Sequence, residues 1–167
     1  MTDDLTIEHM RPDDWERVRE IYREGIATGH ATFETSAPPW EVWDAAHLPF
    51  ARLVARLHDE VIGWAALSPV SQRCVYGGVA EVSVYVAGAA RGAGIGRELM
   101  KALIDAAERN GIWTLQAGLF PENAGSLKLH LSCGFREVGR RERIGKMNGR
   151  WRDTILLERR SPTVGIE

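Results

Sequence analysis

The sequence predicts one mixed α/β domain. Segments in which apolar and polar residues alternate, as in a strand, recur between segments with apolar residues three and four positions apart, as in a helix. Their order is β-α-α-β-β-β-α-β-α-β-β, which gives a sheet of about seven strands flanked by about four helices. The 167 residues suffice for one domain with its own core, structured over about 5–160 and followed by a C-terminal tail at 161–167.

The N-terminal segment predicts a strand and a helix. Residues 5–7 form the strand. Asp13 and Asp14 open the helix, where the positive end of the helix dipole favours carboxylates. One apolar face of this helix consists of Val18, Ile21 and Tyr22. The glycines at 25–29 predict a break after it.

The next segment predicts a short helix and a hairpin. Residues 40–47 form the helix after an irregular stretch. The apolar runs 53–57 and 61–67 flank a His-Asp-Glu turn, which is typical of an antiparallel hairpin. Residues 68–78 are expected to form a loop.

The centre of the chain predicts a strand, a glycine-rich loop and a helix. On the strand at 80–86, Val82, Val84 and Val86 face one side, and Glu81, Ser83 and Tyr85 face the other. The helix spans about 94–110 and presents one apolar stripe to the sheet. A second central strand follows at 112–120.

The C-terminal segment predicts a helix and two strands. The helix spans 124–133 and ends at Gly134, and the strands lie near 136–144 and 150–158. Trp151 and Asp153 are interpreted as structural, since a tryptophan in a late strand usually packs.

Composition excludes several classes of protein. The net charge of −2 and the pI of about 6.2 argue against nucleic acid as a partner. No apolar run is long enough for a membrane span and the N-terminus is acidic, so a cytoplasmic location is expected. Cys74 and Cys133 are expected to be reduced, and no metal-binding constellation is visible.

The loop Arg91-Gly92-Ala93-Gly94-Ile95-Gly96 is a candidate anion site. A strand that turns through glycines into a helix presents free backbone N–H groups at the positive helix end. Arg91 and Arg97 add positive charge. A Walker A loop is excluded because Arg97 and Glu98 follow the last glycine, and a dinucleotide fingerprint is excluded because position 97 is not glycine. On spacing alone, a purely structural tight turn remains the alternative.

These motifs resemble those of the GNAT acetyltransferases. The loop matches that family's R/Q-x-x-G-x-G/A signature, and Asn123 followed by a helix ending in Gly134-Phe135 resembles its next conserved stretch. The resemblance covers essentially the whole chain. It implies the GNAT fold, in which the two central parallel strands splay apart and receive the pantetheine arm of acetyl-CoA.

The resemblance assigns the cofactor-binding residues. Residues 91–96 and Arg97 would bind the pyrophosphate, and Val84 and Val86 the pantetheine. Asn123 and Ser126 would lie near the thioester.

Glu81 is a candidate general base. Acetyl transfer requires an amine to lose a proton, and a carboxylate within a sheet is unfavourable unless it is paired or used. The alternatives are a solvated face or an ion pair with Arg73.

His130 is a candidate general acid, at the position where GNAT enzymes commonly carry a tyrosine. It shares one side of its helix with Ser126, Leu127 and Leu131, and so can point towards the sheet. An imidazole can donate a proton to sulfur at neutral pH. The alternative is a partly exposed histidine without a role.

A closer resemblance is to the phosphinothricin and methionine sulfoximine acetyltransferases. It rests on four features: Thr32-Phe33-Glu34, Ala80-Glu81 before Val84-Tyr85-Val86, Leu129-His130 before Gly134-Phe135, and Gly149-Arg150-Trp151-Arg152-Asp153. The resemblance implies Glu81 as base, Arg73 and Tyr76 as substrate-binding residues, and Phe33 as a wall of the pocket. The chain departs from this subfamily at Ser71, where a lysine is often found.

The expected reaction is direct acetylation of the α-amino group of a small amino-acid analogue. Cys74 has no recognisable histidine partner for a covalent route. The alternatives are a GNAT enzyme for a peptide N-terminus or a polyamine, and a non-catalytic acetyl-CoA sensor. The exposed sheet edge and the apolar late strands predict a homodimer.

Overall fold

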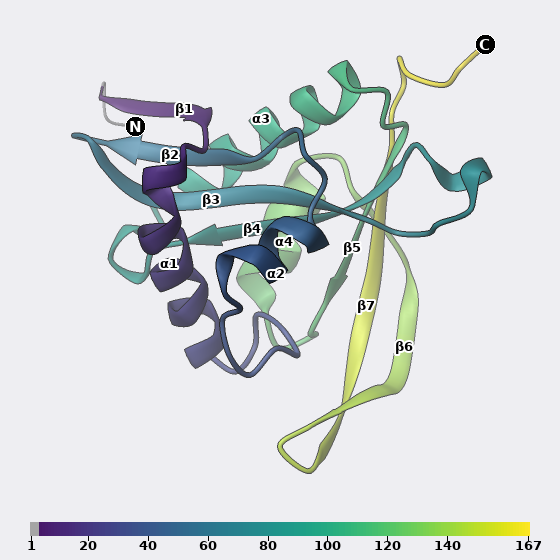
Figure 1. The fold of residues 1–167 in the computed structure, drawn as a ribbon. Helices are drawn as coiled ribbons and strands as arrows, with labels where there is room; N and C mark the ends of the chain where they lie inside the picture. Colours follow the sequence, from purple (N-terminus) through teal and green to yellow (C-terminus); the bar gives the residue numbers. More distant parts are fainter. Residues whose placement is uncertain (1–3) are drawn as a thin grey trace.

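A seven-stranded sheet organises residues 4–167, the part of the chain that the computed structural model describes (Figure 1). The strands are β1 (Leu5–His9), β2 (Leu53–Leu57), β3 (Glu60–Pro69), β4 (Val79–Val86), β5 (Thr114–Leu119), β6 (Arg136–Met147) and β7 (Arg150–Arg160). The helices are α1 (Trp15–Ala27), α2 (Trp40–Ala46), α3 (Ile95–Arg109) and α4 (Ala124–Ser132). The predicted order of elements is confirmed.

The strand order is β1-β2-β3-β4-β5-β7-β6, and β4 and β5 form the one parallel pair among the described residues. This pair is short, since residues 79–81 of β4 align with residues 114–116 of β5 and the two strands then stop pairing. β4 continues to Val86 and β5 to Leu119. The central strands therefore diverge, and the predicted splay is confirmed.

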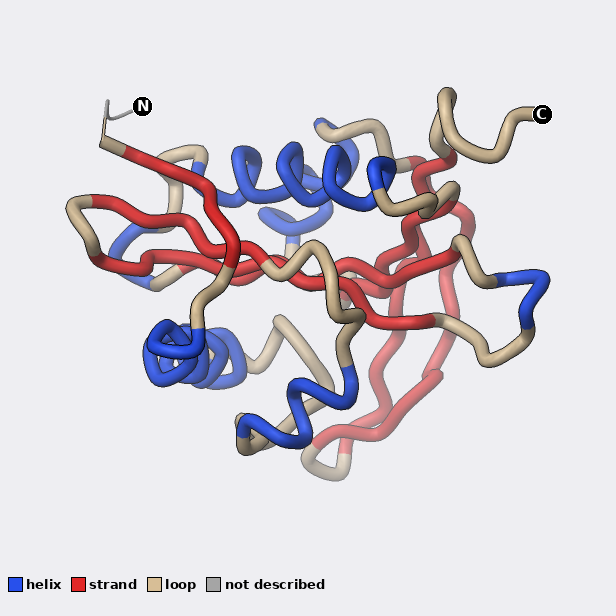
Figure 2. Tube along the Cα trace, turned by 45° about the horizontal axis from the view of Figure 1, so that its top comes forward, coloured by secondary structure: helices blue, strands red, loops and turns tan. Residues whose placement is uncertain are grey.

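The helices lie on both faces of the sheet (Figure 2). α1 and α2 cover one face and α3 the other. On the α3 face, Leu99, Met100 and Leu103 are fully buried, and each contributes about 1.5–3 kcal/mol of stability. On the α1 face, Trp43 and Trp64 meet edge-on at 5.6 Å. Two separate cores thus cover the two faces of the sheet.

Gly25 lies inside α1, which corrects the prediction of a helix break beginning there. The helix continues to Ala27. A Cβ atom on Gly25 would lie 2.6 Å from Cε1 of Tyr85, so the glycine lets the helix approach the β4 side chain. Of these two glycines, Gly29 has a positive φ, and the chain leaves the helix there.

Other elements begin or end a few residues away from their predicted bounds. β5 is shorter than its predicted range, and β6 and β7 are longer. A short 3-10 helix, Cys74–Tyr76, interrupts the predicted loop between β3 and β4. The C-terminal tail is anchored at its start, because Ser161 is buried and donates a hydrogen bond to the Glu108 carboxylate. Across residues 4–167, no helix combines the length and apolar composition that crossing a bilayer requires.

Candidate active site

Glu81 lies at the point where β4 and β5 diverge. It is the last residue of β4 that pairs with β5, opposite Gln116. Its side chain is exposed, and Oε1 accepts a hydrogen bond of 3.3 Å from Gln116 Nε2. Arg73 does not supply this bond; its guanidinium lies 5.6 Å from the centre of the Tyr76 ring. Glu81 is therefore a solvent-accessible carboxylate at the mouth of the gap between the strands.

The glycine-rich loop carries the turn from β4 into α3. Gly92 and Gly94 both have positive φ, of 82° and 83°, and Gly94 is the N-cap residue of α3. A side chain in this left-handed region would be strained. A Cβ atom at either glycine would meet nothing within 4 Å, so these residues serve the backbone turn rather than tight packing. The first N–H groups of this 15-residue helix have no partner within the helix and receive no side-chain cap, as anion binding requires.

Gly96 brings the loop against α4. A Cβ atom on it would lie 3.3 Å from Cδ2 of Leu129 and 3.6 Å from Cγ2 of Val86. The end of β4, the start of α3 and the middle of α4 therefore converge at this glycine. Within the predicted loop, Ile95 is buried and Ala93 is exposed. Val84 and Val86 pack at the margin of the core, beside the gap predicted to hold pantetheine.

The two arginines of the loop are both exposed. Arg91 folds back, and its Nε donates to the Val86 carbonyl at 3.3 Å. This bond occupies a carbonyl in the strand predicted to hold the pantetheine, but an exposed hydrogen bond is easily exchanged for one to a ligand. Arg97 lies in the first turn of α3.

Asn123 begins α4 and uses both ends of its amide. Oδ1 accepts from the Ser126 backbone N–H at 3.2 Å and caps the helix. Nδ2 donates to the His30 carbonyl at 3.1 Å, which links α4 to the segment after α1. Asn123 is thus a bridge within the chain, in addition to its predicted place near the thioester.

His130 is buried, with 4% of its surface exposed, so the alternative of a partly exposed histidine is wrong. Its Nδ1 lies 2.7 Å from the Ser126 carbonyl. A carbonyl only accepts, so Nδ1 carries the proton and Nε2 is left with a lone pair in the neutral ring. Burial lowers the pKa of His130, against the opposing effect of the Ser126 bond. Leu131, predicted on the same side, is instead 48% exposed.

The three predicted substrate residues do not converge within this chain. Phe33 follows α1, and its ring meets the Phe120 ring edge-on at 4.7 Å. Arg73 and Tyr76 contact each other in the loop before β4, which projects from another end of the sheet (Figures 1 and 2). Ser71, the departure from the subfamily pattern, accepts a hydrogen bond from the Arg73 backbone N–H and shapes this loop.

Tyr85 shares the face of β4 that carries Glu81. Its ring stacks on Trp64 at 4.8 Å, and burial raises the pKa of its phenol. The phenol therefore stays protonated at neutral pH. Tyr85 packs in the core and does not act as a base.

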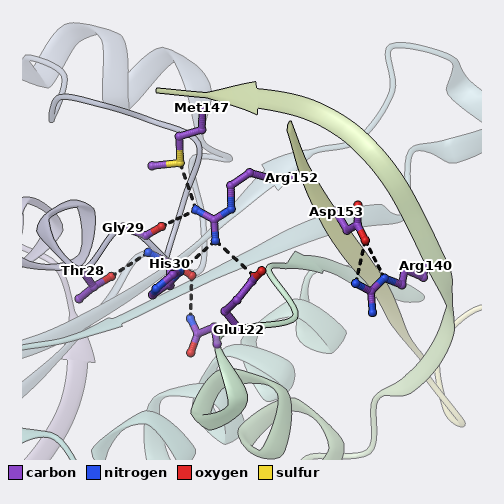
Figure 3. Close-up of polar contacts among 9 residues, drawn as sticks. Thr28, Gly29, His30, Glu122, Arg140, Met147, Arg152 and Asp153 are labelled. Atoms are coloured by element: carbon purple, nitrogen blue, oxygen red, sulfur yellow. Dashed lines mark hydrogen bonds and ion pairs between the residues drawn. The ribbon is translucent and has the colours of Figure 1, made fainter. Parts of the chain in front are cut away.

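Arg152 belongs to one of the four sequence features, but the sequence analysis assigned it no role. Its guanidinium contacts the segment after α1 and the loop before α4 (Figure 3). Asp153 accepts hydrogen bonds from the Arg140 side chain and the Arg143 backbone N–H, which agrees with its structural interpretation. The packing role predicted for Trp151 is wrong, because its side chain is 59% exposed beneath the Lys146 ammonium.

Metal ligands are not gathered anywhere in residues 4–167: no group of three or more His, Cys, Asp or Glu residues is placed to hold an ion.

Comparison with known proteins identifies relatives along most of the chain. Residues 15–135 match the acetyltransferase (GNAT) family. Over 164 residues the chain is 36% identical to the phosphinothricin N-acetyltransferase of Alcaligenes faecalis, covering 92% of this chain and 81% of the relative. It is 30% identical to the L-methionine sulfoximine/L-methionine sulfone acetyltransferase of Salmonella typhimurium, covering 92% and 93%.

A solved structure shares the fold. The GNAT superfamily phosphinothricin acetyltransferase from Sinorhizobium meliloti, in complex with AcCoA, superimposes with a TM-score of 0.89 at 28% identity. The match covers 98% of this chain and 92% of that one.

Proposed function

Since this chain belongs to the GNAT family of acetyltransferases, we propose that it transfers acetyl from acetyl-CoA to the α-amino group of a small amino-acid analogue. L-phosphinothricin, methionine sulfoximine and methionine sulfone are the acceptors named by its relatives. The observation that carries the proposal is the placement of Glu81 at the mouth of the gap between β4 and β5.

The donor would bind on the side of this gap formed by the glycine-rich loop. The uncapped N–H groups at the start of α3, together with Arg91 and Arg97, would hold the pyrophosphate. The strands no longer pair beyond Glu81, so backbone groups near Val84 and Val86 are available for the pantetheine amides. Ala93 and Gly94 would lie against the phosphates, with Asn123 and Ser126 nearer the thioester.

Glu81 would act as the base. The amine nitrogen must lose a proton before it forms the C–N bond, and an exposed carboxylate can take that proton directly or through a water molecule. Backbone N–H groups near Val84 would polarise the thioester carbonyl as its carbon becomes tetrahedral.

His130 would act as the acid when the C–S bond breaks. Its Nδ1–H is committed to Ser126, so the proton for the thiolate must come from Nε2 of the imidazolium. Because burial lowers the pKa of His130, the imidazolium holds that proton weakly and is a minority form at neutral pH. The rate of this step should therefore fall as the pH rises.

The acceptor would be held by Phe33, Arg73 and Tyr76. Phe33 is 37% exposed and offers an aromatic wall. Arg73 offers a planar guanidinium for an anionic group. Arg73 and Phe33 lie on different surfaces of one chain, so a small acceptor can contact both only where a second copy of the chain, in the homodimer proposed below, supplies one of them.

The decisive experiment is a CoA-release screen of the purified protein. Phosphinothricin, methionine sulfoximine, methionine sulfone, common amino acids, spermidine and a peptide with a free N-terminus would each be offered with acetyl-CoA. The proposal predicts the highest kcat/KM for the first three. Preference for the peptide or spermidine would replace the acceptor class, and acetyl-CoA binding without release by any amine would identify a sensor.

We also propose that the protein is a homodimer and that it works in the cytoplasm, a reducing compartment. β6 is an edge strand, and the β6–β7 hairpin exposes apolar side chains, with Ile144 at 53% and Trp151 at 59%. Cys74 and Cys133 are free thiols. Sedimentation of the protein at several concentrations tests the dimer, and a monomer at all of them would contradict it.

A further inference from the structure

The side chain of Arg152 joins three segments that are far apart in the sequence (Figure 3). Nη1 donates to the Gly29 carbonyl at 2.6 Å, and Nη2 lies 2.9 Å from Nδ1 of His30. Nη2 also pairs with the Glu122 carboxylate at 3.3 Å. The side chain is only 13% exposed, so these contacts fix the segment after α1 and the loop before α4 onto β7.

Phe120 connects Arg152 to Phe33. The guanidinium carbon of Arg152 lies 3.8 Å from the centre of the Phe120 ring, and that ring meets Phe33 edge-on at 4.7 Å. Phe33 also lies against Gly145 in β6. A Cβ atom on Gly145 would be 2.7 Å from Cζ of Phe33.

We propose that Gly145 and Arg152 are positioning residues that set the pose of Phe33 and thereby determine which acceptors the enzyme uses. The proposal rests on the proposed function, in which Phe33 forms a wall of the acceptor site. Arg152 holds the segment that carries Phe33, and Gly145 leaves the space that its ring occupies.

Each residue type suits this task. Arginine supplies several donors in a fixed plane and stacks on an aromatic ring, whereas lysine provides a point charge without a stacking face. At Gly145 the backbone needs no positive φ. The ring of Phe33, rather than the backbone conformation, is thus the reason that a side chain is not accommodated there.

Gly145→Ala tests the space for the ring, with Gly139→Ala as a matched control. Both glycines lie in β6, but a Cβ atom on Gly139 would meet nothing within 4 Å. Displacing a substrate-positioning group by about 1 Å can change rates by about 10²-fold, so we expect Gly145→Ala to raise the acceptor KM by about tenfold or more. The order of preference among acceptors of different side-chain length should also change, with the KM for acetyl-CoA unchanged.

The Gly139→Ala protein should behave as the unaltered enzyme. Equal effects of the two substitutions, or a parallel rise in the KM for acetyl-CoA, would overturn the proposal.

Arg152→Met tests the clamp without relying on turnover, and Arg140→Met is its control on the same hairpin. Hydrogen exchange of the amides at 28–34 should accelerate about tenfold or more in Arg152→Met, because local opening governs that exchange. Arg152→Lys should recover only part of the protection, and Arg140→Met should leave exchange unchanged.

The two failures are distinguishable. If the unaltered protein acetylates none of the amines, the proposed function fails while exchange still reports on the clamp. If turnover is as proposed but exchange at 28–34 is the same in all four proteins, the positioning role is wrong.

Discussion

The two halves of the site are held together by contacts of very different range. In the donor half, formed by residues 86–97 and the start of α4, Asn123 caps its helix across 3 positions and Arg91 reaches Val86 across 5. In the acceptor half, formed by residues 28–39 and the β6–β7 hairpin, Arg152 reaches Gly29 across 123 positions. The donor half is a local motif of strand, turn and helix, whereas the acceptor half exists only after the whole sheet has formed.

This difference suggests that the two halves have different functions. In the proposed function, a local turn with two left-handed glycines would bind the common donor in one geometry. A wall assembled from distant segments can change its shape when any one of them changes. We therefore expect substitutions in one half to leave the affinity for the other substrate unaltered.

Substitution of Glu81 should have the largest effect. Glu81→Gln removes the proposed base and should lower kcat/KM by about 10²–10⁴-fold across pH 6 to 9. The Kd for acetyl-CoA, measured by calorimetry, should not change. Glu137→Gln, an exposed carboxylate of β6, is the control and should be without effect. Full kcat/KM in Glu81→Gln would remove the base assignment.

Gly94→Ala should damage the donor half alone. The residue needs a φ of 83°, which costs an alanine about 1–2 kcal/mol, and the strain should raise the Kd for acetyl-CoA by about tenfold. The KM for the acceptor should remain the same. Gly111→Ala, which has a similar positive φ and open space around it but lies outside the donor half, is the matched control. An equal loss in both variants would mean that the turn is not specific to the donor.

Asn123 bridges the two halves, and its variants can separate them. Asn123→Ala loses the helix cap and should destabilise the protein by about 1 kcal/mol in urea unfolding. Asn123→Asp keeps an oxygen acceptor for the cap but cannot donate to the His30 carbonyl. We expect it to retain most of the stability and still raise the acceptor KM. If the Asp variant matched the Ala variant in stability, the cap would not be the main contribution.

The smallest effect expected is on the pH dependence of stability. Burial lowers the pKa of His130 in α4 and of His47 beside Trp43, so at mildly acidic pH the unfolded chain binds protons that the folded chain does not. Stability should therefore fall from about pH 7 to about pH 5.

Urea unfolding at several pH values checks this expectation. His130→Gln and His47→Gln should each flatten the decline, but only His130→Gln should alter the pH profile of kcat. A change of that profile in His47→Gln alone would contradict the assignment of His130.

The sequence predicted the features that depend on local patterns and missed those that depend on contacts between distant segments. The valine alternation of β4, the glycines at 92–96 and Gly134 at the end of α4 are local patterns, and each predicted its element or turn. The role of Arg152 depends on carbonyls and rings that only the folded sheet brings near, and the sequence carries no local signal for such contacts. Gly145 likewise looked unremarkable in a strand, because the ring it accommodates is that of Phe33.

Two errors have the same cause. Trp151 was expected to pack because large aromatic residues in strands usually do, but its strand pairs with an edge strand whose hairpin leaves it exposed. Gly25 was expected to break a helix, but it provides room for Tyr85 of β4. In both cases the tertiary neighbour, rather than the residue's intrinsic preference, decided its role.

The most direct test of the proposed reaction uses acetyl-CoA that carries an isotope label in its acetyl group, with phosphinothricin as the acceptor. Mass spectrometry and NMR of the product, with intact-mass analysis of the protein exposed to acetyl-CoA alone, follow the label. We predict that the label appears on the α-amino nitrogen of phosphinothricin and that the protein itself remains unlabelled. An acetylated protein, or an unlabelled amine, would contradict direct transfer to the amino group.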